Sequence, residues 1–181
     1  MIIGITQRQI KINDILHDCL DPNWYSLLSS HILIPIPNIV PQKEINIDIL
    51  IISGGDQTPD REKVEDYYFN YAQERRIPII GICHGAFYIN QKFNGKNGII
   101  DNHKNCRHII DMLKSKYDVN SFHTMNIHKL GENLIELATC THDQSIEAFR
   151  HENLPIWGII WHPERENIPI LPHEVRELLN A

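Results

Sequence analysis

Ile77-Pro78-Ile79-Ile80-Gly81-Ile82-Cys83-His84-Gly85 is a short apolar run that ends in a glycine, cysteine, glycine pattern. This combination predicts a buried strand that turns sharply into a helix. The same turn occurs in the nucleophile-elbow motif, in which small residues leave room for a strained backbone and one side chain stands above the strand end. Here that side chain is the thiol of Cys83, although a cysteine between apolar residues is also common as a small, inert core residue.

A second apolar run, Trp157-Gly-Ile-Ile-Trp161, is followed by His162-Pro163-Glu164. It predicts another buried strand that delivers an imidazole and a carboxylate at its end. The imidazole can take the proton of a thiol, and a carboxylate two positions along an extended segment points to the same side and can orient the ring. The two motifs together predict a thiol nucleophile with its base, unless the three residues meet by chance.

Gly-Ile-Cys-His-Gly and His-Pro-Glu resemble the motifs of the class I glutamine amidotransferase superfamily. The resemblance extends over most of the chain, because several motifs occur in the expected order. It implies a catalytic triad of Cys83, His162 and Glu164. It also implies a three-layer α/β fold of the flavodoxin-like kind, with a central, mostly parallel sheet and flanking helices.

Gly54-Gly55, at the end of the apolar run 45–53, resembles the oxyanion turn of this superfamily. The resemblance implies that the backbone amides of Gly55 and His84 hold the oxyanion. Asp56 departs from the proline that usually follows the glycines, and a carboxylate here would hinder a developing oxyanion unless it turns away or contacts a substrate cation. No Gly-Lys-Ser/Thr ending follows, so the turn is not a nucleoside-triphosphate loop.

Further segments resemble substrate-binding elements of the superfamily. Ser121-Phe122-His123 resembles the Ser-x-His element that holds the α-amino and α-carboxylate groups of a glutamyl substrate, and Arg107-His108 resembles a segment of γ-glutamyl hydrolases. Arg8 follows the first predicted strand, at the sheet edge where α/β proteins bind ligands. The predicted substrate-binding residues are Gly54, Ser121, Phe122, His123, Arg8, Arg107 and His108.

The expected substrate carries a γ-glutamyl group on a larger leaving group. Phe87 stands where ordinary amidotransferases have a substrate-gripping glutamine, and no synthetase is fused within the 181 residues. These features resemble γ-glutamyl-γ-aminobutyrate hydrolases and, through Gly4–Arg8 and Asp21–Tyr25, the amidotransferase-like proteins of bacterial capsule phosphoramidate synthesis. The latter resemblance implies hydrolysis of γ-glutamyl-CDP-amidate, with Arg8, Lys104 and Arg107 near its diphosphate. The alternatives are a glutaminase that feeds a separate synthetase and a catalytically inactive binding module.

Composition supports one domain spanning residues 1–181, because 42% of the residues are hydrophobic and no flexible linker divides them. A net charge of −6 with dispersed basic residues predicts neither nucleic-acid nor membrane binding. Four cysteines without a Cys-x-x-Cys pair, and no signal peptide or membrane span, predict a cytoplasmic protein with reduced thiols. No cofactor is expected, and the sequence leaves a weak homodimer open.

The histidine-rich segment 101–108 is expected to be a loop that borders the site. Metal ligation by His103, Cys106 and His108 is conceivable, but their spacing matches no zinc pattern, so no metal is predicted. The charged helix expected over residues 61–76 buries a stripe of Val64 and tyrosines and takes no part in chemistry. The remaining predicted strands are 2–6, 31–37, 45–53, 134–139, 145–149 and 155–161, and the remaining helices begin at Asp21, His84 and His173.

Overall fold

The computed structural model describes residues 1–180, so Ala181, included in the predicted domain, lies outside the described residues. The strands are β1 (Ile2–Thr6), β2 (Arg8–Ile12), β3 (Ile15–Cys19), β4 (Ile32–Ile36), β5 (Ile49–Ile52), β6 (Ile79–Ile82), β7 (Lys96–Ile99), β8 (Lys104–Met112), β9 (Ser115–Phe122), β10 (Met125–Lys129), β11 (Leu134–Cys140), β12 (Ile146–His151) and β13 (Ile156–Ile159). The helices are α1 (Asn23–Leu27), α2 (Pro59–Arg75), α3 (His84–Lys92), the 3-10 turn η1 (Pro163–Arg165) and α4 (His173–Leu179).

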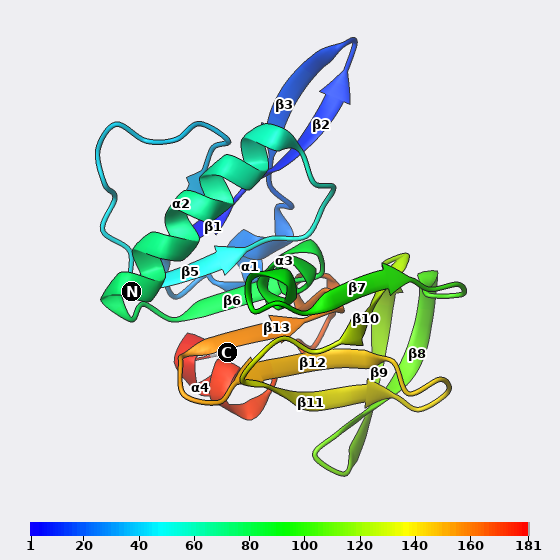
Figure 1. Ribbon diagram of the computed structural model, residues 1–181. Coiled ribbons are helices and arrows are strands. Elements are labelled where there is room, and N and C mark those ends of the chain that lie inside the picture. The colour runs from blue at the N-terminus through cyan, green and yellow to red at the C-terminus, as the bar shows by residue number, and fades with distance from the viewer. Residues whose placement is uncertain (181) are drawn as a thin grey trace.

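A nine-stranded sheet forms the centre, in the order β4-β1-β5-β6-β13-β12-β11-β8-β9 (Figure 1). The pairs from β4 to β13 are parallel. From β13 to β9 every pair is antiparallel, so the sheet is mixed. Short turns explain the antiparallel half: β8 and β9 are joined by Leu113 and Lys114, both with positive φ, as in the tightest hairpins. The α/β fold class is confirmed.

Helices cover both faces of the parallel half, which gives three layers. The α2 and α3 helices pack on one face, with Leu50 and Ile52 of β5. The α1 and α4 helices pack on the other, where Trp24 and Val175 meet Ile49 and Ile51. Because both faces are covered, the parallel strands β5 and β6 are wholly buried, as their continuous apolar sequences predict.

The predicted helices are confirmed, with small differences at their ends. Helix α2 begins after Thr58, whose hydroxyl accepts a hydrogen bond from Arg61 N at 3.3 Å. In α1, Pro22 occupies the cap position, and Asp21 Oδ1 accepts from Asn23 N at 3.1 Å. The expected packing of Trp24 beneath the sheet is confirmed, because its side chain is 2% exposed.

The prediction of a loop over residues 101–108 is wrong from Lys104 onward. This part begins β8, which pairs with β9 from Lys104 opposite Phe122 to Met112 opposite Ser115. The β2–β3 hairpin and the β7–β10 pair were also not predicted, since neither has a continuous apolar face. Sequence patterns miss such strands because they are half exposed, and because inward positions of β8 carry polar residues such as His108.

Candidate active site

The turn at Cys83 has the geometry of a nucleophile elbow. Cys83 has φ 51° and ψ −103°, a strained conformation between the end of β6 and the start of α3. A Cβ placed on Gly81 would lie 2.5 Å from the carbonyl carbon of Gly85, and one on Gly85 would lie 2.1 Å from Ile52 O. Both glycines are therefore required for the helix to pack this closely on the strands, and the packing keeps the Cys83 side chain at the sheet edge.

The structure brings Cys83, His162 and Glu164 together. His162 Nδ1 donates to Glu164 Oε1 at 2.7 Å, and both side chains are buried. A Cβ built on Gly54 would lie 2.5 Å from His162 Cε1 and 3.4 Å from Cys83 Cβ, so the ring and the cysteine flank the same glycine. Burial alone would lower the pKa of His162, but interactions with Cys83 and Glu164 outweigh it and raise the pKa to about 9. The imidazole is therefore protonated at neutral pH, and its charge favours a thiolate beside it.

Asn120 fixes the backbone of His162 from the neighbouring strand. Its side-chain amide donates to His162 O at 2.8 Å and accepts from His162 N at 2.9 Å. Sequence reasoning missed this residue, because an asparagine within the polar strand β9 gives no distinguishing signal.

The glycine turn after β5 lies beside the elbow. Gly55 has φ +129°, a conformation that other residues rarely adopt, and it lines the same pocket as Cys83 and His84. The turn thus lies where the resemblance placed the oxyanion-binding amides. Asp56 also lines this pocket and is exposed.

Helix α2 supports this turn, so the expectation that it takes no part in the site needs correction. Arg61 is fully buried and donates to Glu65 Oε1 at 2.7 Å, to Ser53 O at 2.5 Å and to Gly54 O at 3.2 Å. The other oxygen of Glu65 lies 2.8 Å from Nε2 of His84. Burial would raise the pKa of Glu65, but His84 and Arg61 lower it on balance. A signal was present in the sequence: Arg61 and Glu65 share a helical stripe with the buried Tyr68.

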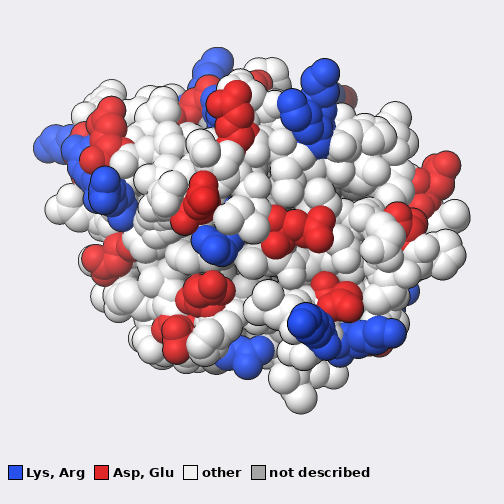
Figure 2. Space-filling model, turned by 60° about the horizontal axis from the view of Figure 1, so that its bottom comes forward, with Lys and Arg blue, Asp and Glu red and all other residues white. Residues whose placement is uncertain are grey.

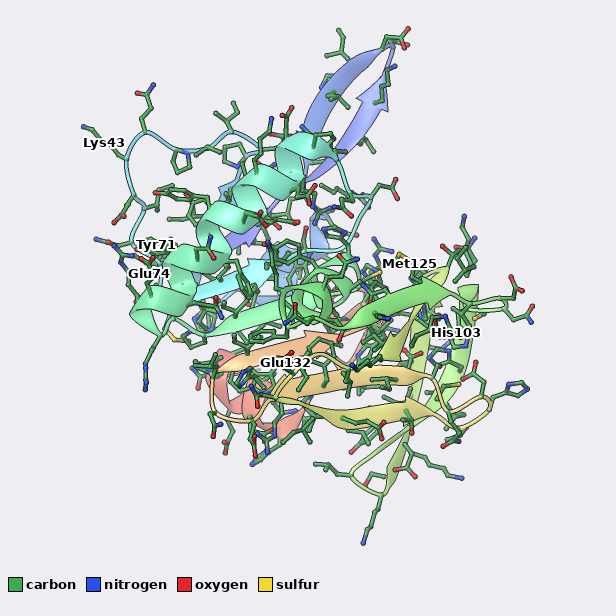
Figure 3. The ribbon with its side chains drawn as sticks, viewed as in Figure 1. Lys43, Tyr71, Glu74, His103, Met125 and Glu132 are labelled. Atoms are coloured by element: carbon green, nitrogen blue, oxygen red, sulfur yellow. The ribbon has the colours of Figure 1, made fainter. Side chains whose placement is uncertain are left out.

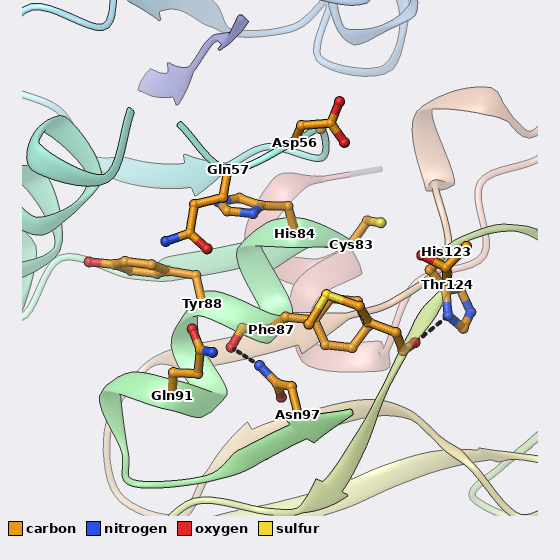
Figure 4. A pocket seen from close by; sticks show the side chains of 12 residues that line it. Asp56, Gln57, Cys83, His84, Phe87, Tyr88, Gln91, Asn97, His123 and Thr124 are labelled. Atoms are coloured by element: carbon orange, nitrogen blue, oxygen red, sulfur yellow. Dashed lines mark hydrogen bonds between the residues drawn. The ribbon is translucent and has the colours of Figure 1, made fainter. Parts of the chain in front are cut away.

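A pocket of about 640 Å³, open to solvent, lies in front of Cys83. Figure 4 shows Cys83 and His84 at the start of α3, with His123 and Thr124 on the segment that joins β9 to β10. Phe87, at the position of the usual glutamine, is part of the lining. Polar side chains complete the pocket wall, namely those of Gln57, Tyr88, Gln91, Asn97 and Thr124.

The Ser121-Phe122-His123 element borders the site, but two of its side chains point elsewhere. The Ser121 hydroxyl is buried and donates to His103 O. His123 Nδ1 donates to Met125 O at 2.7 Å, and burial lowers the pKa of His123. Phe122 packs edge-on against the His162 ring, with centroids 5.6 Å apart. Only Phe122 thus has a side chain in contact with the predicted triad.

The predicted basic residues separate into two groups. Arg8 lines a recess with Gly54, His162 and Glu164, close to the triad. Arg107 is instead held by Asp118 and Glu166 on the surface, and His108 lies in a buried histidine cluster, so neither lines the pocket of Cys83.

Arg165 is a basic residue near the triad that the sequence interpretation missed. Its guanidinium stacks 4.8 Å from the Phe122 ring centre, and its Nε lies 3.7 Å from Glu164 Oε1. Over the wider surface, acidic and basic side chains are interspersed on the face shown in Figure 2.

The comparisons with known proteins agree with this geometry. A family model described as glutamine amidotransferase class-I matches residues 24–176. The chain belongs to the class I glutamine amidotransferase family. Among its relatives, the γ-glutamyl-CDP-amidate hydrolase of Campylobacter jejuni is 36% identical over 92% of this chain and 92% of the relative. One of the subunits of the glutamine-hydrolysing GMP synthase of Methanosarcina mazei is 34% identical over 71% of this chain and 72% of the relative.

Solved structures of the amidotransferase family share the fold. A glutamine amidotransferase from Methylobacillus flagellatus superposes with a TM-score of 0.67 over 99% of this chain and 74% of that one, at 13% identity. Within residues 1–180, the structure contains no helix that is both long and apolar enough to cross a membrane.

Proposed function

We propose that this chain is a cysteine-dependent hydrolase of γ-glutamyl-CDP-amidate, the CDP-linked form of glutamine. It releases L-glutamate and cytidine diphosphoramidate, the latter for modification of a capsule polysaccharide. The observation that carries the proposal is the 36% identity, over 92% of both chains, to the hydrolase of that name in Campylobacter jejuni. The arrangement of Cys83, His162 and Glu164 supports it, and we treat residues 1–181 as one catalytic domain.

The proposed reaction has two halves. The Cys83 thiolate attacks the γ-carbonyl carbon, and the backbone amides of Gly55 and His84 hold the oxygen that becomes negative. His162 gives its proton to the leaving nitrogen, the C–N bond breaks, and a γ-glutamyl thioester remains. A water molecule then attacks the thioester while His162 takes the proton of that water. The thiolate leaves, and glutamate is released.

Glu164 supports both halves, because it accepts a hydrogen bond from His162 Nδ1 at 2.7 Å. This bond leaves Nε2 of the ring to exchange protons with the thiol and the leaving group, and it stabilises the imidazolium form. The raised pKa of His162, about 9, is consistent with an imidazolium that acts first as an acid.

The pocket supports a leaving group larger than ammonia. Its volume of about 640 Å³, including its open mouth, exceeds the needs of a glutamyl group alone, and Phe87 replaces the usual glutamine. We assign the α-amino and α-carboxylate groups to the backbone around Phe122. We assign the diphosphate to Arg8, because this cation lies beside the triad.

The test is release of glutamate by the purified chain from γ-glutamyl-CDP-amidate, γ-glutamyl-γ-aminobutyrate and glutamine. We expect kcat/KM for the nucleotide to exceed the other two values by at least about 100-fold, equivalent to about 3 kcal/mol of additional transition-state binding. The Cys83→Ser variant is the control for contaminating activity. A preference for free glutamine would overturn the proposal.

A glutaminase that supplies ammonia to a separate synthetase is the second candidate, favoured by the 34% identity to the GMP synthase component of Methanosarcina mazei. It predicts weak hydrolysis of glutamine by the isolated chain and strong stimulation by a synthetase partner. Nucleotide-dependent hydrolysis without a partner separates the two candidates.

A further inference from the structure

A cluster of histidines surrounds a buried carboxylate behind the pocket wall. His103 precedes β8, His108 lies on β8, His123 follows β9, and Glu147 lies on β12. Figure 3 places His103 in the part of the molecule formed by β8, β9 and β10. Glu147 is wholly buried, and His103 and His123 are each 4% exposed. The proposed reaction uses none of these side chains.

The facing atoms of this cluster have no hydrogen-bond partners. They are Nδ1 of His103, Nε2 of His123 and Oε2 of Glu147, and all three are shielded from solvent. Buried polar atoms are almost always paired, because losing hydration without a replacement is costly. Three unpaired atoms that converge on one point therefore indicate a missing ligand.

The distances fit a metal ion better than hydrogen bonds. His103 Nδ1 lies 3.5 Å and His123 Nε2 lies 3.6 Å from Glu147 Oε1. Two ligand atoms that each bind zinc at 2.0–2.1 Å in a tetrahedron are about 3.4 Å apart. We propose that this cluster binds a zinc ion through His103 Nδ1, His123 Nε2 and Glu147 Oε1.

The other nitrogen of each ring is fixed in the way a metal site requires. His103 Nε2 donates to Asp143 Oδ2 at 2.8 Å, and His123 Nδ1 donates to Met125 O at 2.7 Å. These bonds place the proton on the outer nitrogen and leave the inner lone pair free. Histidine ligands of zinc usually have such a carboxylate or carbonyl partner.

His108 is the nearest candidate for a fourth ligand. Its Nε2 lies 3.4 Å from Glu147 Oε2, and neither atom has a hydrogen-bond partner. Cys140 is the other candidate, because its sulfur and the ligand atoms of His103 and His108 lie within 4.8 Å of one another. The sequence interpretation considered Cys106, but its thiol donates to Asn102 O and lies outside these groups.

The ion would have a structural role. It would join β12 to the ends of β8 and β9 and to the segment before β10, which carries Thr124 and Met125 of the pocket wall. Its ligand atoms are closed to solvent, unlike those of a catalytic zinc, which keeps an open position. The inference is independent of which substrate the pocket accepts.

The first experiment measures metal content by mass spectrometry in protein purified from zinc-supplemented cells. We expect about one zinc per chain in the wild type and loss of zinc in Glu147→Gln and His103→Gln. His151→Gln is the matched control, because His151 is a buried histidine on the same strand that belongs to neither group of facing ligand atoms. Cys83→Ser must retain zinc, since this variant removes the other thiol and imidazole pair that might hold it.

The second experiment uses wild-type protein, so it does not depend on variants that fold. We expect a chelator to lower the Tm by about 5–10 °C relative to protein with zinc at about 100 times its Kd, and added zinc to restore it. Added Co²⁺ should give the visible absorption of a tetrahedral site. Asp143→Asn should weaken zinc binding by about 10–100-fold.

Two results would overturn the assignment. One is a wild-type protein that contains no zinc, takes up no Co²⁺ and keeps the same Tm with chelator or zinc. In that case protonated histidines balance Glu147. The other is zinc that disappears in Cys83→Ser but remains in Glu147→Gln, which would move the ion to the active site.

Discussion

Replacement of Arg61 by methionine tests whether helix α2 holds the oxyanion turn. Arg61 is fully buried and reaches Glu65 and the carbonyl oxygens of Ser53 and Gly54. Methionine fills similar space but removes the charge and every donor. The variant therefore leaves the Glu65 carboxylate buried with only His84 and Thr6 as partners.

The size of the effect follows from this burial. Removal of one partner of a buried ion pair costs about 3–5 kcal/mol, which in a chain of this size corresponds to a fall in Tm of about 6–20 °C. Arg75→Met is the matched control on the same helix, because its side chain is 42% exposed and pairs with Glu44 on the surface. The control should cost at most about 1 kcal/mol. Since the turn also carries Gly55, kcat should fall in Arg61→Met by up to about 10²–10³, the effect of losing one oxyanion donor.

The assays are urea denaturation, which gives the free energy of unfolding, and release of glutamate under saturating substrate. The double variant with Glu65→Leu should recover part of the lost stability, because it removes the unpaired charge. It should not recover kcat, since the turn remains unanchored. An Arg61→Met protein no less stable than Arg75→Met would refute the electrostatic reasoning, and unchanged kcat would refute the link to the turn.

Three further predictions concern the site itself. Cys83→Ala should abolish glutamate release and keep the wild-type circular dichroism spectrum, and measurable turnover would exclude the thiol as the nucleophile. Because the pKa of His162 is raised from 6.5 to about 9, its contribution to stability should be full below pH 6.5 and disappear as pH rises through about 9. The alkaline limb of kcat/KM should lie near the same pH and move lower in Glu164→Gln, and a limb that stays in place would contradict the role of Glu164. Gly55→Ala should cost about 1–3 kcal/mol in stability and lower kcat, because φ is +129° and the new Cβ would lie 2.6 Å from Arg8 Cβ; an equally active variant would exclude this turn from oxyanion binding.

The parts of the site that were predicted from sequence have short, local signals. The elbow at Cys83 depends on glycines at fixed positions, and the triad partners His162 and Glu164 follow a buried strand of unmistakable apolar character. Such features are set by backbone sterics and by the period of a strand, so neighbouring residues suffice to reveal them. The same reasoning located the glycine turn after β5.

Contacts between distant segments were not predicted. The bonds from Asn120 to His162, from Arg61 to the glycine turn and from Asp143 to His103 join residues separated by 42, 7 and 40 positions. The placement of Arg107 on the surface was likewise unexpected, because two acidic partners hold it there.

The sequence alone therefore determined the α/β fold class, the strand-to-helix turn at Cys83 and the identity of the three residues proposed for catalysis. Only the tertiary structure decided which polar residues are buried together, above all the histidines around Glu147. The physical reason is that a buried charge is tolerated only with a partner, and packing brings that partner from another strand. Hydrophobic periodicity reports which face of a segment is inside, but it cannot report what that face meets.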